Sequence, residues 1–285
     1  MIKSLFCLLI MFVFTVPAIA QHERLDAIED SIVNEGKALY RSEWASWYGT
    51  DIVLEKCAAK KALLGGYFSY ETHDNLINIF YSQDKSPLVL ASVTFNKDFN
   101  VQNYKLDTIP RKLTTTELDY YSIRLAAAIQ MEHDTIFKYY KNSNLNLIPI
   151  IQKGEKKVYA LSGPKDNGVL IFGNDYLLRF NIANELTSIK KLHKNIIPIY
   201  TKSDSGKTAS STMHTHLKES GDFMSATDIC TLLLYERFTS WQTHYVISKD
   251  YVSLWDCKKN MLIILTMEAW KKIGADQQTR HPEKE

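Results

Sequence analysis

Short β-prone runs, interrupted by only a few segments with helical periodicity, are the feature that most constrains the fold of this 285-residue chain. Runs rich in Val, Ile, Tyr and Phe predict strands where polar turns separate them. Helical periodicity is confined to residues 22–47, 114–140, 225–238 and 266–273. We therefore expect an α+β fold, with a mixed sheet flanked by helices. The expected strands are 67–70, 76–81, 88–95, 148–152, 157–161, 169–171, 176–180, 195–200, 212–216, 245–247, 252–255 and 262–265.

The first twenty residues carry the pattern of a signal peptide. Lys3 precedes an apolar run from Leu5 to Val16, and Ala18-Ile19-Ala20 is a small-residue cleavage site. The run is shorter than the ~20 apolar residues that span a bilayer, although an uncleaved N-terminal anchor remains the alternative. We expect cleavage before Gln21 and export to the periplasm or the medium, with no transmembrane segment afterwards. The Lys-, Asn-, Ile- and Tyr-rich composition favours a bacterial source.

The remaining chain divides by pattern into three parts. We expect an N-terminal α/β module at residues 21–145, a C-terminal domain at 146–273 and a polar tail at 274–285. A capping box at Thr114-x-x-Glu117 predicts the start of the long helix in the first part. The role of residues 21–145 and the oligomeric state are not indicated by any motif.

Charge and cysteine content narrow the function classes. Lys and Arg number 34 against 32 Asp and Glu, so the basic excess of a nucleic-acid binder is missing. With 45% hydrophobic and 23% charged residues, the chain has a globular composition. Export permits disulfides, but the three cysteines after the leader, Cys57, Cys230 and Cys257, allow at most one. We keep two alternatives: a Cys230–Cys257 bridge, or three buried thiols.

One constellation carries chemistry. His214-Thr215-His216 is followed, after an eight-residue gap, by Ser225-x-x-Asp228. Side chains two apart on a strand point to one face, and Ser225 and Asp228 fall on the first turn of the next helix. Two imidazoles and a carboxylate are the ligands of a zinc site with an open fourth position, where zinc lowers the pKa of water to ~7. The alternative is that Ser225 and Asp228 only cap the helix.

This arrangement resembles the JAB/MPN (JAMM) metalloprotease family over about residues 150–265. In that family a strand carries His-x-His and a helix begins at Ser-x-x-Asp, as 225–238 does here. A strand pair follows, which 245–248 and 251–255 match, and Tyr159-Ala160-Leu161-Ser162-Gly163 resembles the first strand. The resemblance implies a JAB/MPN-like fold with cytidine-deaminase-like layering, preceded by the N-terminal α/β extension.

The resemblance also implies site roles. His214, His216 and Asp228 would hold Zn²⁺, and Ser225 would support the oxyanion. The general base of the family is a Glu near the first strand, for which Glu155 and Glu185 are the candidates, or Glu219 and Asp222 in the intervening loop. The implied function is an exported zinc-dependent amide or isopeptide hydrolase acting on peptides or cell-wall crosslinks. The alternative is a non-catalytic envelope binding protein on a degenerate JAB/MPN-like fold.

Other polar residues have a structural and a functional interpretation. His244 is either a structural strand histidine or a hydrogen-bond partner of the metal site. His193 lies in the basic run 190–194, typical of a solvated strand edge or of a site for an acidic ligand. Asp175 is part of a turn that joins two strands, or a cation ligand. Further candidates are Cys230, interpreted as core packing rather than a nucleophile, and Glu71, His73 and Asp74 as a metal-binding turn.

Overall fold

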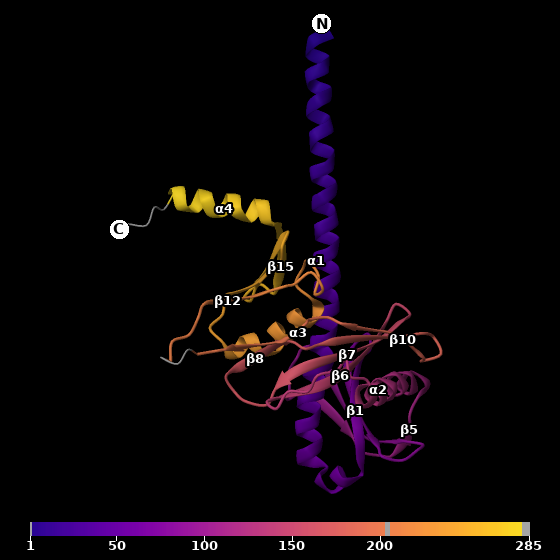
Figure 1. Cartoon of the computed structure of the whole chain (residues 1–285). Helices are drawn as coiled ribbons and strands as arrows, with labels where there is room; N and C mark the ends of the chain where they lie inside the picture. Colours follow the sequence, from indigo (N-terminus) through magenta and orange to yellow (C-terminus); the bar gives the residue numbers. More distant parts are fainter. Residues whose placement is uncertain (1, 203–205, 281–285) are drawn as a thin grey trace.

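The computed structural model (Figure 1) describes residues 2–202 and 206–280, with side chains from residue 22 on. The α-helices are α1 (Ile2–Lys56), α2 (Thr115–His133), α3 (Ala226–Tyr235) and α4 (Met267–Arg280), and two 3-10 turns are η1 (Ala58–Leu63) and η2 (Glu236–Phe238). The strands are β1 (Leu64–Glu71), β2 (Asn75–Ser82), β3 (Leu88–Asn96), β4 (Tyr104–Asp107), β5 (Arg111–Lys112), β6 (Ser143–Gln152), β7 (Glu155–Pro164), β8 (Val169–Gly173), β9 (Tyr176–Phe180), β10 (Leu186–Lys191), β11 (Ile196–Tyr200), β12 (Ser211–Thr215), β13 (Thr243–Ile247), β14 (Tyr251–Asp256) and β15 (Met261–Thr266).

The N-terminal sheet is an antiparallel meander in the order β1-β2-β3-β4, with β5 beside β3. Its strands alternate their side chains between two apolar clusters, one on each face. On one face Trp44 and Val53 of α1 pack against the sheet, and on the other Tyr120 of α2 stacks on Phe68. Helices therefore cover both faces of this sheet.

The middle sheet has the order β10-β9-β7-β6 and is antiparallel throughout. Ile123 and Ala127 of α2 pack on one face, whereas Leu39 of α1 and Leu234 of α3 pack on the other. Helix α2 thus contacts both the N-terminal and the middle sheet.

A third layer covers α1 and α3 from the opposite side. It contains the pair β11-β8 and the sheet β12-β13-β14-β15, in which β12 and β13 run parallel and the other pairs antiparallel. Trp255 and Val246 pack there against Ile229 of α3 and residues 25–33 of α1. The parallel pair requires a crossover, and α3 supplies it by connecting β12 to β13.

Helix α1 runs through the whole molecule, as Figure 1 shows, and touches all three layers. It crosses α3 closely at Gly36, where an added Cβ would meet Ile229 at 2.5 Å. The helix expected at 22–47 continues to Lys56, since Val53 and Cys57 are buried against the N-terminal sheet.

Two other helix ends differ from expectation. Helix α2 ends at His133 rather than near Tyr140, because Asp134 adopts an extended backbone and its side chain accepts the N–H of Ile136. Helix α4 continues to Arg280, past the expected end at 273, while residues 281–285 lie outside the described part.

The expected α+β class, with mixed sheets flanked by helices, is confirmed. The division at residue 145 stays a prediction. The expected signal peptide, residues 1–20, falls among the residues whose side chains are not described, so export also stays a prediction. Among the helices with described side chains, from residue 22 on, none has the length and apolarity needed to cross a membrane.

Candidate metal centre

His214 and His216 lie side by side at the end of β12. Both are 5% exposed, and Thr215 between them is exposed, as the alternation of a strand requires. The ladder with β13 pairs His214 with Val246 and continues one step further, where the His216 N–H donates to the Ile247 carbonyl at 2.9 Å. The strand register therefore presents both imidazoles to the interior.

Asp228 approaches the two histidines from the first turn of α3. Ser225 and Asp228 form a complete capping box: the Ser225 hydroxyl accepts the Asp228 N–H at 3.1 Å, and Asp228 Oδ2 accepts the Ser225 N–H at 2.8 Å. Asp228 Oδ2 also lies 3.5 Å from His216 Nε2, and Oδ1 lies 3.7 Å from His214 Nε2. From the sequence, helix capping and metal binding are alternatives for Ser225 and Asp228. In the structure, Asp228 takes part in the cap and also lies beside the two histidines.

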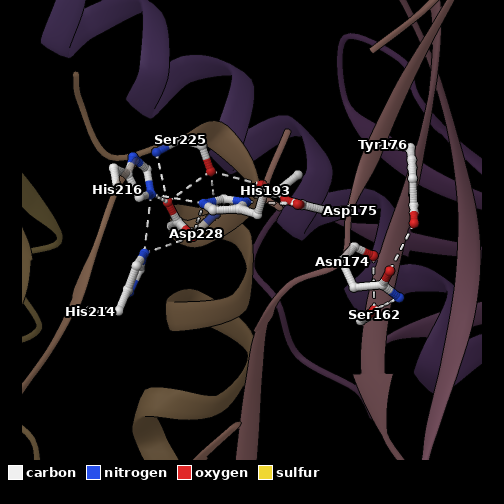
Figure 2. A network of polar contacts seen from close by, with 10 residues as sticks. Ser162, Asn174, Asp175, Tyr176, His193, His214, His216, Ser225 and Asp228 are labelled. Atoms are coloured by element: carbon white, nitrogen blue, oxygen red, sulfur yellow. Dashed lines mark hydrogen bonds and ion pairs between the residues drawn. The ribbon is translucent and has the colours of Figure 1, made fainter. Parts of the chain in front are cut away.

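A third histidine completes the group. His193, between β10 and β11, is 2% exposed, so the interpretation of residues 190–194 as a solvated edge is wrong at this position. Its Nε2 lies 2.8 Å from His216 Nε2 and 3.6 Å from Asp228 Oδ1. We call His193, His214, His216 and Asp228 the His/Asp cluster (Figure 2).

The spacing within the His/Asp cluster fits a bound cation. One ligand atom from each residue lies within 4.8 Å of all the others, and His214 Nε2 stands 3.2 Å from His216 Nε2. Four ligands at 2.0–2.1 Å from zinc, placed at the corners of a tetrahedron, stand about 3.4 Å apart. The separations given above, from 2.8 to 3.7 Å, bracket that edge length.

Unpaired polar atoms point to the same conclusion. Asp228 Oδ1 and His216 Nδ1 are buried without a hydrogen-bond partner. A buried carboxylate oxygen without a donor is costly, whereas a metal ion would satisfy Oδ1 directly. The His/Asp cluster therefore fits a metal ion by its donors and by the unmet demand of its carboxylate.

Outer residues orient two of the three rings. His193 Nδ1 lies 2.7 Å from Asp175 Oδ1, and Asp175 Oδ2 accepts the hydroxyl of Thr227. His214 Nδ1 lies 3.0 Å from His244 Nε2, whose Nδ1 contacts Thr212 Oγ1 at 2.8 Å. His244 thus adopts the position of a hydrogen-bond partner of the site, one of its two interpretations from sequence.

The turn that carries Asp175 is held by its own polar network (Figure 2). Asn174 has φ +49°, in the left-handed region, and its buried amide donates to Ser162 Oγ and to the Lys138 carbonyl. Tyr176 OH donates to Asn174 Oδ1 at 2.8 Å. These bonds fix the turn between β8 and β9 from which Asp175 reaches His193.

Burial and the charges of neighbouring side chains set the pKa values within the His/Asp cluster. Burial opposes a charged His193, but the carboxylates of Asp175 and Asp228 outweigh it and raise the pKa of His193 to about 9. Burial lowers the pKa of His214 to about 4 and that of His244 to about 3. Burial alone would raise the pKa of Asp228, but the neighbouring His193 and His214 hold it well below its usual value. Asp228 is therefore an anion ready to bind a cation.

The carboxylates considered as general base make their contacts elsewhere. Glu155 has a 61% exposed side chain and pairs with Lys157 at 2.7 Å. Glu185 accepts from Asn181 in an exposed turn. Neither they nor Glu219 and Asp222 make a described contact with the His/Asp cluster, so their role as base stays a prediction.

A groove borders the His/Asp cluster at His193 and His214. Its volume is about 500 Å³, and its walls come from the start of β11 and from β12, with Ile197 and Met213 among the apolar residues. Lys194 and Asn195 also line it. The buried cluster therefore has one described side that faces an open depression.

The remaining sequence candidates have structural explanations. Glu71 is bound by Arg41 and Lys97, and within the described chain it belongs to no group that could hold a metal. Cys57, Cys230 and Cys257 are free thiols, and the first two are buried. Ser225 contacts Asp228 Oδ2 through its hydroxyl at 2.8 Å, and its role toward an oxyanion stays a prediction.

The comparisons add no relative: no protein-family model, no curated protein and no solved structure matches the chain. The likeness to JAB/MPN proteins therefore depends on the motif and its structural setting alone.

Proposed function

We propose that this protein binds one zinc ion through His193, His214, His216 and Asp228, and that the ion stabilises a non-catalytic binding module of the bacterial envelope. The observation that carries the proposal is the convergence of three imidazole Nε2 atoms and one carboxylate, all buried, within 4.8 Å. Imidazole and carboxylate groups are suitable zinc ligands. Because the cysteines lie outside the His/Asp cluster, an exported chain of this sequence would have to bind zinc through such groups.

The number of protein ligands favours a closed zinc centre, in which protein groups fill all four positions, over a catalytic one. A catalytic zinc site keeps one position for water, whereas four protein ligands fill the tetrahedron of a structural site. His193, whose Nε2 lies 2.8 Å from His216 Nε2, would fill the coordination position that the sequence pattern left open. Among the described residues, the carboxylates that contact the histidines of the cluster are Asp228 and Asp175, and Asp175 already accepts the Thr227 hydroxyl, so neither is placed as a free base for water.

The groove supports a second candidate, a zinc-dependent amide or isopeptide hydrolase of the JAB/MPN type. When bound in the cluster, zinc would supply a Lewis acid that polarises a carbonyl group. Strands β11 and β12 flank the groove, and among the described strands each pairs on one side only, which suits an extended peptide. Peptides or cell-wall crosslinks are the substrates that the expected location favours.

Zinc stoichiometry of the purified full-length chain tests the proposal. We expect about one zinc per chain, lost in His214→Ala and retained in His73→Ala, a matched histidine variant at an exposed turn. Absence of zinc from the wild type after metal is added back would overturn both candidates. Zinc-dependent cleavage of peptide or crosslink substrates, lost in His214→Ala, would favour the hydrolase over the closed centre.

A further inference from the structure

His193 is the ligand whose position depends least on regular structure. It lies between β10 and β11, while His214 is on a strand and Asp228 on a helix. The segment that carries it is tied instead to the β8–β9 turn. The Leu192 N–H donates to the Asp175 carbonyl at 2.9 Å, and the Asn174 N–H donates to the Asn195 carbonyl at 3.0 Å.

Asp175 adds the side-chain half of this connection. It is fully buried, and its two carboxylate oxygens have different partners: Oδ1 contacts His193 Nδ1 at 2.7 Å, and Oδ2 accepts the Thr227 hydroxyl. Thr227 directly precedes Asp228 on α3. One carboxylate therefore connects His193, which lies outside the strands, with the helix turn that carries Asp228.

The partner at Nδ1 decides what Nε2 can do. A carboxylate that accepts the Nδ1 proton leaves the Nε2 lone pair free for a metal and increases its basicity. The corresponding partner of His214 is the neutral His244, and His216 Nδ1 has no hydrogen-bond partner. Among the described residues, Asp175 is thus the one carboxylate that orients a ring of the His/Asp cluster through Nδ1.

We propose that Asp175 is the positioning residue that keeps the metal centre closed, by holding His193 in the fourth coordination position. This inference rests on the proposed zinc site and deepens it. Without the Asp175 carboxylate, His193 withdraws, and three ligands remain with a position that small anions can enter.

Cobalt spectroscopy of the full-length chain tests the proposal without any assay of activity. The variants are Asp175→Ala, Asp175→Asn, which keeps the shape, and Thr227→Val, which removes the hydroxyl that orients Asp175. Asp166→Asn, at an exposed loop position, is the matched control for a lost carboxylate. Each protein is loaded with Co²⁺ in place of zinc, and its visible spectrum is recorded with and without azide. Zinc affinity is measured by competition with a chromogenic chelator.

We expect the wild type and Asp166→Asn to give spectra that azide does not change. Asp175→Ala should give an altered spectrum that shifts with azide, and zinc affinity 10–100-fold weaker, roughly the range for loss of such a partner. Asp175→Asn and Thr227→Val should give azide responses and zinc affinities between those of the wild type and Asp175→Ala. These two variants test the role of Asp175 if Asp175→Ala does not fold.

An azide response in the wild type would overturn the closed centre. Unchanged spectra and affinities in folded Asp175→Asn and Thr227→Val would overturn the role of Asp175, while the zinc site itself would stand. Failure of the wild type to bind either metal would instead refute the proposed function.

Discussion

Two helices of this protein begin with the same motif and use it differently. At α2, Thr114 and Glu117 form a capping box, and at α3, Ser225 and Asp228 form another. In each, the carboxylate at the third helical position is 1% exposed and accepts the N–H of the cap residue at 2.8 Å. The local sequence rule is therefore satisfied equally at both sites.

The two carboxylates differ in the other partners of their oxygen atoms. Arg111 donates to both oxygens of Glu117 at 2.7 Å, and Tyr70 OH donates to Oε1 at 3.3 Å. Burial raises the pKa of Glu117, but the hydrogen bonds from Arg111 and the Thr114 backbone lower it overall. Asp228 Oδ1 has no such donor and faces the imidazoles of His193 and His214. A capping carboxylate can serve as a metal ligand where no side chain donates a hydrogen bond to its second oxygen.

The largest expected effect comes from neutralising each capping carboxylate in turn. Asp228→Asn should weaken zinc binding about a hundredfold or more, since four ligands share roughly 10–16 kcal/mol of binding free energy. Glu117→Gln should leave zinc binding unchanged and destabilise the fold by about 1–3 kcal/mol through lost bonds to Arg111. Zinc titration and thermal unfolding of both variants measure these effects. Equal zinc loss in Glu117→Gln would break the comparison.

Removing the metal should destabilise the wild type. At free zinc about 100 times Kd, a bound ion stabilises the folded state by about 2.7 kcal/mol. For a chain of this size that corresponds to roughly 4–5 °C in Tm. Differential scanning fluorimetry with and without a chelator measures the shift. Asp228→Asn should show no chelator-dependent change, and a similar shift in that variant would place the metal elsewhere.

A third buried carboxylate sharpens the comparison through pH. Glu43 on α1 is 3% exposed, and burial raises its pKa to about 7, only partly opposed by Arg124 and by a 3.4 Å contact from Asn146. Because the pKa of Glu43 in the folded protein exceeds its ordinary value of 4.5, the stability that this group contributes is present below pH 4.5 and is lost as pH rises through 7.

Glu43→Gln should therefore gain stability relative to wild type between pH 5 and pH 8, by about 3 kcal/mol at most. Urea unfolding at both pH values measures the gain. Glu117→Gln is the control, because its carboxylate has a lowered pKa and should lose stability relative to wild type at pH 8. A pH-independent difference for Glu43→Gln would show that Glu43 is ionised throughout.

The smallest expected effects are those of the cap hydroxyls. Thr114→Ala and Ser225→Ala should each destabilise the fold by about 1 kcal/mol. Only Ser225→Ala should also weaken zinc binding, by about tenfold, because the Ser225 hydroxyl contacts Asp228 Oδ2 at 2.8 Å. Urea unfolding and chelator competition separate the two effects. A tenfold zinc loss in Thr114→Ala would mean that helix stability alone controls affinity.

The contrast between local motifs and contacts from distant parts of the chain explains what could be predicted from the sequence. His214, His216 and Asp228 lie within fifteen residues, so strand alternation and a helix start were enough to predict that they meet. The α+β class followed from the pattern of short runs. His193 and Asp175 meet them through turns far along the chain, and the surrounding lysines favoured a solvated edge. The one local sign was a histidine flanked by Leu192 and the apolar start of β11.

Helix lengths failed for a related reason. The end of α1 at Lys56 is set by packing of Val53 on a sheet formed later in the chain. The end of α2 is set by Asp134, whose side chain forms a local turn that competes with the helix. Apolar periodicity in the sequence reveals packing of a helix on a distant sheet only where the periodic pattern continues without a break.

The close crossing of α1 and α3 at Gly36 bears on how the molecule unfolds. Since α1 packs against all three layers, the layer that carries β12 has no complete core without residues N-terminal to the division proposed at 145. Folding of the two halves should thus be cooperative. A fragment starting at 146 would lack the helix against which Ile229 packs, and with it the support that holds Asp228 opposite the histidines.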